Sequence, residues 1–253
     1  MILESVKTKL KLLKLSNMFL EIEDALRESE NSGRTYLEFL NELLETELTQ
    51  RAIKRIERRI KQASFPVIKT VADFDFSLRP KLNKHQILSF CEGEFVSKKE
   101  NLIFVGEPGV GKTHLSIAIA YELCRKDKRV WFTTGTGLIN KLREAKDEKA
   151  LSRYFSNAQS LDLVVIDEVG YFPFEKESSE LFFQYISERY ERGSLIITSN
   201  LPFSKWNEIF YTERLTTAIL DRLIHHCHIL EMTGESYRFS ESVKKKNKRK
   251  TKK

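Results

Sequence analysis

The sequence has no hydrophobic run that approaches the roughly 18 residues needed to cross a bilayer, and it is poor in cysteine. The three cysteines, Cys91, Cys124 and Cys227, are odd in number and far apart, so they offer neither a disulfide framework nor a CxxC metal pair. We therefore expect a reducing, cytoplasmic environment. Charged residues recur from Glu4 to Lys14 and interrupt any signal-peptide core, so we expect neither secretion nor a membrane partner.

Basic charge is unevenly spread along the chain. The 253 residues include 43 Lys and Arg against 36 Asp and Glu, a net charge of +7, but eight of the basic residues lie within 244–253. We expect residues 241–253 to form a disordered basic tail, because a terminal run of one charge sign is typical of disorder and attracts polyanions. The remainder is nearly neutral, and its hydrophobic residues, 41% of the whole sequence, are sufficient for a sizeable core.

Residues 1–66 are predicted to form a small all-α domain. Up to residue 64 the segment has one glycine and no proline, and its apolar residues recur at helical spacing. Thr35 and Glu38 resemble a capping box that starts a helix, and Pro66 is expected to stop the last one. A separate helix is predicted over residues 50–64. Its basic residues are candidates for binding DNA phosphates, with a merely solvated face as the alternative: Arg51, Lys54, Arg55, Arg58, Arg59 and Lys61.

Residues 67–240 have the pattern of an α/β domain. After a linker and one helix, short apolar runs alternate with segments long enough for crossover helices. Continuous apolar runs are typical of parallel strands whose two faces are both covered. The predicted strands are Asn101–Val105, Arg129–Thr133, Leu161–Asp167, Ser194–Ser199 and Cys227–Leu230.

Residues 106–113, Gly-Glu-Pro-Gly-Val-Gly-Lys-Thr, match the phosphate-loop pattern GxxxxGK[ST] at every position. The motif lies between a predicted strand and a predicted helix, Thr113–Arg125. Its backbone N–H groups can surround an oxyanion, and the helix N-terminus adds positive potential. Lys112 is expected to reach the β- and γ-phosphates and Thr113 to bind Mg²⁺. The expected nucleotide-binding residues are Gly106, Glu107, Pro108, Gly109, Val110, Gly111, Lys112, Thr113 and His114.

A second part of the same site is predicted where the strand over 161–167 ends. Asp167 and Glu168 follow an apolar run, and the carboxyl ends of parallel strands are where ligands bind in open α/β sheets. Asp167 is expected to hold Mg²⁺, and Glu168 to deprotonate a water that attacks the γ-phosphate. Asn200 ends the next strand, which could be a neighbour, and we expect it to help position that water.

These segments together resemble the IstB family of AAA+ ATPases. The resemblance rests on Asp73-Phe74-Asp75-Phe76, the phosphate loop with His114 and Leu115, and the runs 165–171, 197–200, 218–223 and 234–238. It implies a P-loop NTPase with a five-stranded parallel sheet covered by helices, similar to DnaC helicase loaders and DnaA initiators. It also implies ATP and Mg²⁺, duplex DNA bound largely without sequence preference, a transposase partner, and ATP-dependent homo-oligomers.

The resemblance assigns further roles. Asn200 takes a sensor position, and Arg238 would be a second sensor that binds nucleotide. Arg222 would be an arginine finger acting on ATP bound by a neighbouring subunit, with Arg214 as its rival. A guanidinium at the γ-phosphate offsets the charge that develops in the transition state.

Two other functions stay open. A DnaC-type loader would have the same ATPase but a replicative helicase as partner. A nucleotide-gated scaffold would bind ATP with little turnover, although it has no need of a base such as Glu168.

Two further clusters are given structural interpretations. His225, His226 and His228 with Cys227 make a poor zinc cage, because successive residues on a strand point to opposite faces. We expect the aromatic residues that follow the acids, Tyr171, Phe172 and Phe174, to pack under the next helix rather than stack on bases.

Overall fold

The computed structural model describes residues 1–234 and residue 236. The chain divides into two compact units, Met1–Arg58 and Arg59–Lys253. Helix α3 (Tyr36–Ala63) runs through this division. The predicted boundary between a helical domain (residues 1–66) and an α/β domain (residues 67–240) stays a prediction. The expected basic tail over 241–253 lies outside the described residues.

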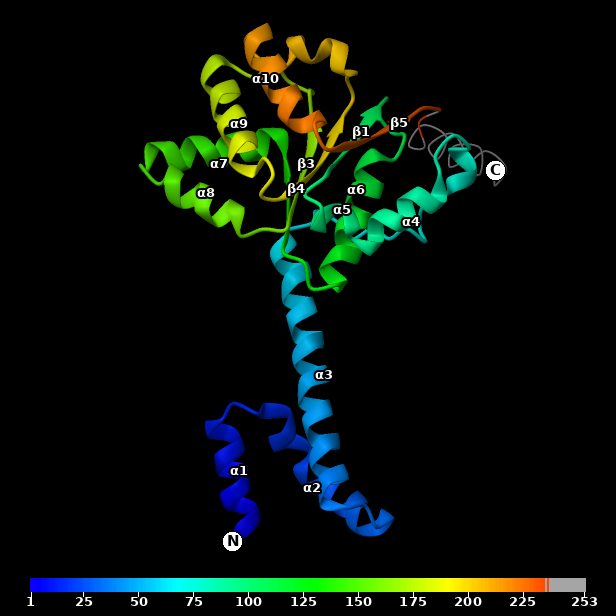
Figure 1. Cartoon of the computed structure of the whole chain (residues 1–253), viewed down its shortest axis with the longest axis vertical. Helices are drawn as coiled ribbons and strands as arrows, with labels where there is room; N and C mark the ends of the chain where they lie inside the picture. The colour runs from blue at the N-terminus through cyan, green and yellow to red at the C-terminus, as the bar shows by residue number, and fades with distance from the viewer. Residues whose placement is uncertain (235, 237–253) are drawn as a thin grey trace, which may run out of the picture. The chain divides into compact units, whose positions relative to one another are not determined.

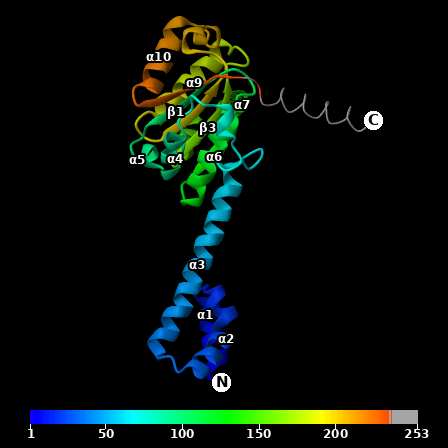
Figure 2. The same cartoon turned by 90° about the vertical axis from the view of Figure 1, so that its right-hand side faces the viewer.

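The first unit contains α1 (Ile2–Leu12), α2 (Ser16–Ser32) and the N-terminal part of α3, beside which the two shorter helices lie (Figure 2). Its small core consists of Leu10, Met18, Ile22 and Leu43. The predicted capping box is confirmed at the start of α3. The N–H of Thr35 donates to Glu38 Oε2 at 2.8 Å, and the N–H of Glu38 donates to Thr35 Oγ1 at 3.3 Å.

The prediction of a separate helix over residues 50–64 is wrong, because α3 is continuous from Tyr36 to Ala63. A buried acid that the sequence did not single out joins this helix to α2. Glu47 Oε2 accepts the N–H groups of Asn17 and Met18 at 2.7 and 3.1 Å, so it caps the first turn of α2. Arg51 Nε donates to the same carboxylate at 2.7 Å.

The second unit is built on the predicted parallel sheet of five strands, and their order is β2-β3-β4-β1-β5. Its strands are β1 (Asn101–Gly106), β2 (Val130–Thr134), β3 (Leu163–Val169), β4 (Ser194–Ser199) and β5 (Cys227–Met232). All four strand pairs are parallel. β4 therefore lies between β1, which leads into the phosphate loop, and β3, which carries the two acids.

Helices cover both faces of the sheet (Figure 1). One face packs against α4 (Lys84–Glu92), α5 (Glu94–Ser97) and α6 (Lys112–Arg125), and the other against α7 (Gly135–Asp147), α8 (Leu151–Gln159), α9 (Lys176–Arg189) and α10 (Glu213–Ile224). Short 3-10 helices are η1 (Phe76–Leu78) and η2 (Phe203–Glu208). Alternate β1 residues, such as Leu102 and Ile103, enter the two opposite cores, which explains the unbroken apolar runs.

Across the described part of the chain, every helix is too short or too polar to cross a bilayer.

Candidate nucleotide-binding site

The phosphate loop connects β1 to α6 at the carboxyl edge of the sheet. Gly109 and Gly111 have φ values of 82° and 102°, a region where a side chain would be strained. Gly111 is also the N-cap residue of α6, and it has no side chain that could cap the helix. The N-terminus of α6, with its backbone N–H groups and the positive end of the helix dipole, can bind an anion.

The Lys112 ammonium lies within the loop. Its Nζ donates to the carbonyl oxygens of Gly106 and Glu107 at 2.6 and 2.8 Å. Lys112 is only 7% exposed, whereas Glu107 and Pro108 at the start of the loop are exposed. A positive charge held among loop carbonyls is positioned to exchange them for the stronger acceptors of a phosphate.

Thr113 and Asp167 meet across the site, as their predicted shared role requires. Thr113 Oγ1 lies 2.9 and 3.0 Å from the two carboxylate oxygens of Asp167. Thr198 Oγ1 on β4 donates to Asp167 Oδ1 at 2.5 Å. One hydroxyl and one buried carboxylate are hard oxygen donors of the kind that Mg²⁺ prefers, so these residues fit that ion.

A β-bulge in β3 separates the two acids. Ile166 pairs with Ile197 and Val169 with Ser199, so Asp167 and Glu168 together occupy one position opposite β4. Glu168 adopts φ 60°, its N–H donates to Thr198 Oγ1 at 2.9 Å, and its side chain is exposed while Asp167 is buried. The bulge turns two consecutive carboxylates into one buried and one accessible group.

Thr198 is the site residue that sequence reasoning missed. Its hydroxyl contacts both the Asp167 carboxylate and the Glu168 backbone, and the residue is 1% exposed. The sequence shows a hydroxyl residue near the end of an apolar strand. That residue can be assigned to the site only when the register between β3 and β4 is known.

Asn200 directly follows β4, and the predicted adjacency of β3 and β4 is confirmed. Within the described residues, the Oδ1 atom of Asn200 is buried without a hydrogen-bond partner. A buried carbonyl oxygen without a partner is costly. Its position at the carboxyl edge fits a group that awaits a water or a ligand.

His114 uses its ring outside the phosphate pocket. Its Nε2 lies 2.9 Å from the Thr70 carbonyl oxygen. Its ring packs edge-on against the Phe74 ring, with 5.4 Å between the two ring centres. Any contribution of His114 to nucleotide binding therefore comes from its main chain. Arg238, the other residue expected to bind nucleotide, lies outside the described part of the chain.

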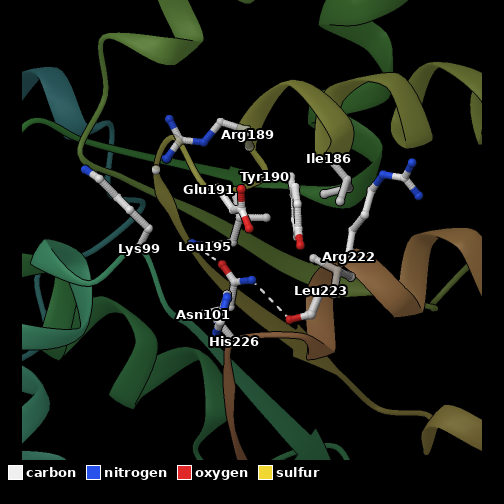
Figure 3. Close-up of a pocket in the computed structure, with 11 residues that line it drawn as sticks. Lys99, Asn101, Ile186, Arg189, Tyr190, Glu191, Leu195, Arg222, Leu223 and His226 are labelled. Carbon is white, nitrogen blue, oxygen red and sulfur yellow. Dashed lines mark hydrogen bonds between the residues drawn. The ribbon is translucent and has the colours of Figure 1, made fainter.

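Arg222 lies at the opposite edge of the sheet from the phosphate loop. It lines a hollow together with Asn101 and Leu195, which lie at the amino ends of β1 and β4 (Figure 3). Its Nη1 donates to the Ala218 carbonyl at 2.8 Å, and its guanidinium lies 4.7 Å from the centre of the Phe183 ring. The rival Arg214 is exposed in the first turn of α10.

The candidate DNA-binding residues differ in their surroundings. Lys54 Nζ donates to Asn17 Oδ1 at 3.2 Å, and Arg59 pairs with Asp127 at 3.0 Å. Arg51 donates to Glu47, so it too contacts a protein group. Arg55, Arg58 and Lys61 are exposed along α3.

The aromatic prediction is wrong for two of its three residues. Tyr171 and Phe172 are exposed, at 42% and 68%, whereas Phe174 packs against Phe182 and Phe210.

The histidines do not converge as a set. His228 pairs with Glu100 at 2.9 Å. His225 and His226 instead approach Glu191, with ligand atoms within 4.8 Å of one another, but all three are exposed and His225 Nδ1 lies 2.6 Å from the Tyr190 hydroxyl.

Asp167→Asn is expected to raise the melting temperature of the nucleotide-free protein. Burial raises the pKa of the Asp167 carboxyl, although hydrogen bonds from Thr198 and Thr113 oppose the shift. The folded chain therefore holds this proton more tightly than the unfolded chain, and stability falls as pH rises through the raised pKa. The gain from Asp167→Asn should be largest at neutral pH and shrink toward the usual aspartate pKa.

Calorimetry at neutral and mildly acidic pH measures this gain, with the exposed Asp24→Asn as a matched control. The same variant should lose the stabilisation that ATP with Mg²⁺ confers. A lower melting temperature than that of the wild type at neutral pH would contradict the buried-charge penalty.

The strand order, the phosphate loop after β1 and the acid pair on β3 define a P-loop protein of the AAA+ class. The chain belongs to the family of IstB-like ATP-binding proteins, whose model matches residues 8–246. This confirms the family resemblance found in the sequence.

Similar proteins agree with this assignment. The chain is 36% identical to the inferred ATP-binding protein of insertion sequence IS232 from Bacillus thuringiensis subsp. berliner, over 96% of this chain and 98% of that protein. It is 38% identical to the corresponding IS21 protein of Pseudomonas aeruginosa, over 92% and 88%. In fold it is similar to AMPPCP-bound DnaA from Aquifex aeolicus (TM-score 0.55, 21% identity, 70% of this chain and 55% of that one) and to DnaI (TM-score 0.52, 21% identity, 66% and 89%).

Proposed function

We propose that the protein is an ATP-hydrolysing, DNA-binding helper of insertion-sequence transposition. It would assemble on duplex DNA with ATP, and recruit or regulate a transposase. The observation that carries the ATPase part is the connected set Thr113–Asp167–Thr198, which leaves Glu168 accessible beside it. The transposition part is supported by the insertion-sequence relatives.

In this mechanism the loop N–H groups and Lys112 bind the β- and γ-phosphates, and Thr113 and Asp167 hold Mg²⁺. When bound, Mg²⁺ supplies charge neutralisation at the phosphate oxygens. The Glu168 carboxylate takes the proton of the attacking water, and Asn200 Oδ1 accepts a hydrogen bond from that water and orients it. The buried Asp167 and the accessible Glu168 thereby divide ion binding from proton transfer.

The placement of Arg222 supports the proposed assembly. A guanidinium at the amino edge of the sheet is remote from the phosphate loop of its own subunit, so as a finger it would serve a neighbour. Turnover would then depend on a homo-oligomer, which links ATP hydrolysis to the assembled state.

DNA contact is assigned to the exposed basic residues of α3, most directly Arg58 and Lys61. Such side chains bind phosphates rather than base edges, so binding should be largely independent of sequence and should weaken as salt rises.

Binding of labelled duplex DNA, measured with ATP, with ADP and without nucleotide, tests the proposal. ATP should strengthen binding in the wild type and not in Lys112→Ala. The double variant Arg58→Ala/Lys61→Ala should weaken binding across sequences and flatten the logarithmic salt slope by about 2, since each phosphate contact contributes roughly 0.9.

The matched control is Lys9→Ala/Lys11→Ala, which removes two exposed lysines of α1 and should leave the salt slope unchanged. ATP-dependent DNA binding that survives Lys112→Ala would refute the proposal. Equal losses in the two double variants would show that net charge, not α3, governs binding. Co-purification identifies the partner, and recovery of a replicative helicase instead of a transposase would favour the loader function.

A further inference from the structure

The linker segment, defined as residues 70–79, contacts the phosphate loop and the first turn of α6 at three points. The Thr70 carbonyl lies against His114, as described above. The Phe74 ring covers Gly111 so closely that a Cβ there would lie 2.6 Å from Phe74 Cε2. Arg79 Nε donates to the Val110 carbonyl at 3.0 Å. The segment thus packs on the outer side of the loop.

Arg79 makes its contact with the loop through a charged side chain, and it is 6% exposed. Its Nη1 also donates to the Leu78 carbonyl at 2.7 Å, which fixes the plane of the guanidinium against its own backbone. Gly234 leaves space for the arginine, because a Cβ atom at this position would lie 3.1 Å from Arg79 Nη1. An arginine so enclosed holds the Val110 carbonyl in one direction.

The direction of that carbonyl determines the direction of the next N–H. The peptide between Val110 and Gly111 is planar and trans, so the Gly111 N–H points opposite to the Val110 oxygen. With the oxygen turned outward to Arg79, the Gly111 N–H turns away from the linker segment. Gly111 is the N-cap residue of α6, where N–H groups bind phosphate.

We propose that Arg79 is a positioning residue for nucleotide binding, which acts through the Val110 carbonyl to aim the Gly111 N–H at the bound phosphates. The proposal rests on the nucleotide site described above and adds to it a residue outside the motif. Without this hydrogen bond the Val110–Gly111 peptide loses a contact that fixes its orientation, and the neighbouring glycines Gly109 and Gly111 allow it to rotate. The affinity for the phosphate chain then falls.

Arg79→Met is expected to raise the Kd for ATP and for ADP about tenfold, the scale of one hydrogen bond to a charged group. KM for ATP should rise with kcat little changed, because the effect is on binding and not on the attacking water. Arg79→Lys keeps one charged donor and should restore part of the affinity. Fluorescent-nucleotide titration and steady-state turnover measure these changes.

Arg79 also lines a cavity of about 150 Å³ with Lys81, Leu82 and Glu231, so direct contact with a nucleobase must be distinguished from loop orientation. Inorganic tripolyphosphate has no base, and it provides the separating probe. Loop orientation predicts the same relative loss for tripolyphosphate as for ATP in a competition titration. A loss confined to ATP would overturn the proposal.

A second buried arginine provides the control for general destabilisation. Arg189 is fully buried, and its guanidinium donates to the carbonyls of Ala158, Leu161 and Ser194 at 2.6, 2.9 and 2.9 Å, away from the loop. Arg189→Met should lower the melting temperature but leave the nucleotide Kd unchanged when measured well below that temperature.

The outcomes separate the two proposals. If the wild type binds no ATP, the proposed function fails. If the wild type binds ATP and Lys112→Ala does not, but Arg79→Met keeps the wild-type Kd, only the role of Arg79 fails. Equal loss of affinity in Arg79→Met and Arg189→Met also overturns it.

Discussion

Arg222→Ala is expected to reduce ATP turnover by about 10³-fold or more while leaving ATP affinity close to that of the wild type. Arg222 donates to the Ala218 carbonyl of its own helix, α10, and its guanidinium lies over the Phe183 ring of α9, at the amino edge of the sheet. The phosphate loop lies at the other edge, so loss of this side chain removes nothing from the nucleotide pocket of its own subunit. In the proposed mechanism, it removes the charge that a neighbouring subunit requires in the transition state.

A mixture of two inactive variants tests this directly. Arg222→Ala subunits keep Glu168, and Glu168→Gln subunits keep Arg222, so a mixed assembly contains complete sites and should regain part of the turnover. Each variant alone should remain inactive at every protein concentration. Failure of the mixture to regain activity, although both variants assemble, would contradict a finger supplied by the neighbour.

Arg214→Ala is the matched control, because Arg214 is an exposed arginine in the first turn of the same helix. Its turnover should stay within a few-fold of the wild type. The opposite pattern, with turnover lost in Arg214→Ala and kept in Arg222→Ala, would assign the finger to Arg214.

Glu168→Gln is expected to lower turnover by about 10²–10⁴-fold, the usual contribution of a general base, with the Kd for ATP unchanged. Glu168 is held through its backbone N–H on Thr198, so the amide should keep the bulge and its geometry. Single-turnover hydrolysis and a parallel ATP titration measure the two effects. Because ATP persists, the ATP-dependent complex with DNA should last longer than that of the wild type.

The exposed carboxylate Glu180 on α9 offers the comparison, and Glu180→Gln should hydrolyse ATP at the wild-type rate. If Glu168→Gln also turned over at that rate, the residue would not be the base. A slow wild-type rate that Glu168→Gln left unchanged would favour the nucleotide-gated scaffold.

Much of the second unit was predictable because its signals are local. Unbroken apolar runs mark the central strands β1, β3 and β4, which are covered on both faces, and all five strands begin and end within two residues of the predicted bounds. The phosphate-loop glycines are required by the backbone angles that the loop adopts, as at Gly109 and Gly111. The Thr35–Glu38 capping box spans only one helical turn, and it too could be read from the sequence.

The first unit was less predictable. The helix expected over residues 50–64 is part of α3, because no glycine or proline interrupts residues 36–63 and a change to a basic surface does not end a helix. Nothing in the local sequence distinguishes Glu47 from a surface acid. Its role as the cap of α2 depends on a contact about 30 residues away in sequence.

By itself, the sequence determined that this protein has a phosphate loop, an acid pair after a buried strand, and an α/β domain to hold them. Those features depend on motif spacing and on local hydrophobic pattern. Only the tertiary structure decided how the parts meet. The insertion of β4 between β1 and β3 places Thr198 against Asp167 and Asn200 beside them, and one bulge turns Glu168 outward. The tertiary structure also decided that Arg79 lies on the outer side of the loop and Arg222 at the opposite edge of the sheet. Strand order and long-range packing set these positions, and no local sequence pattern encodes them.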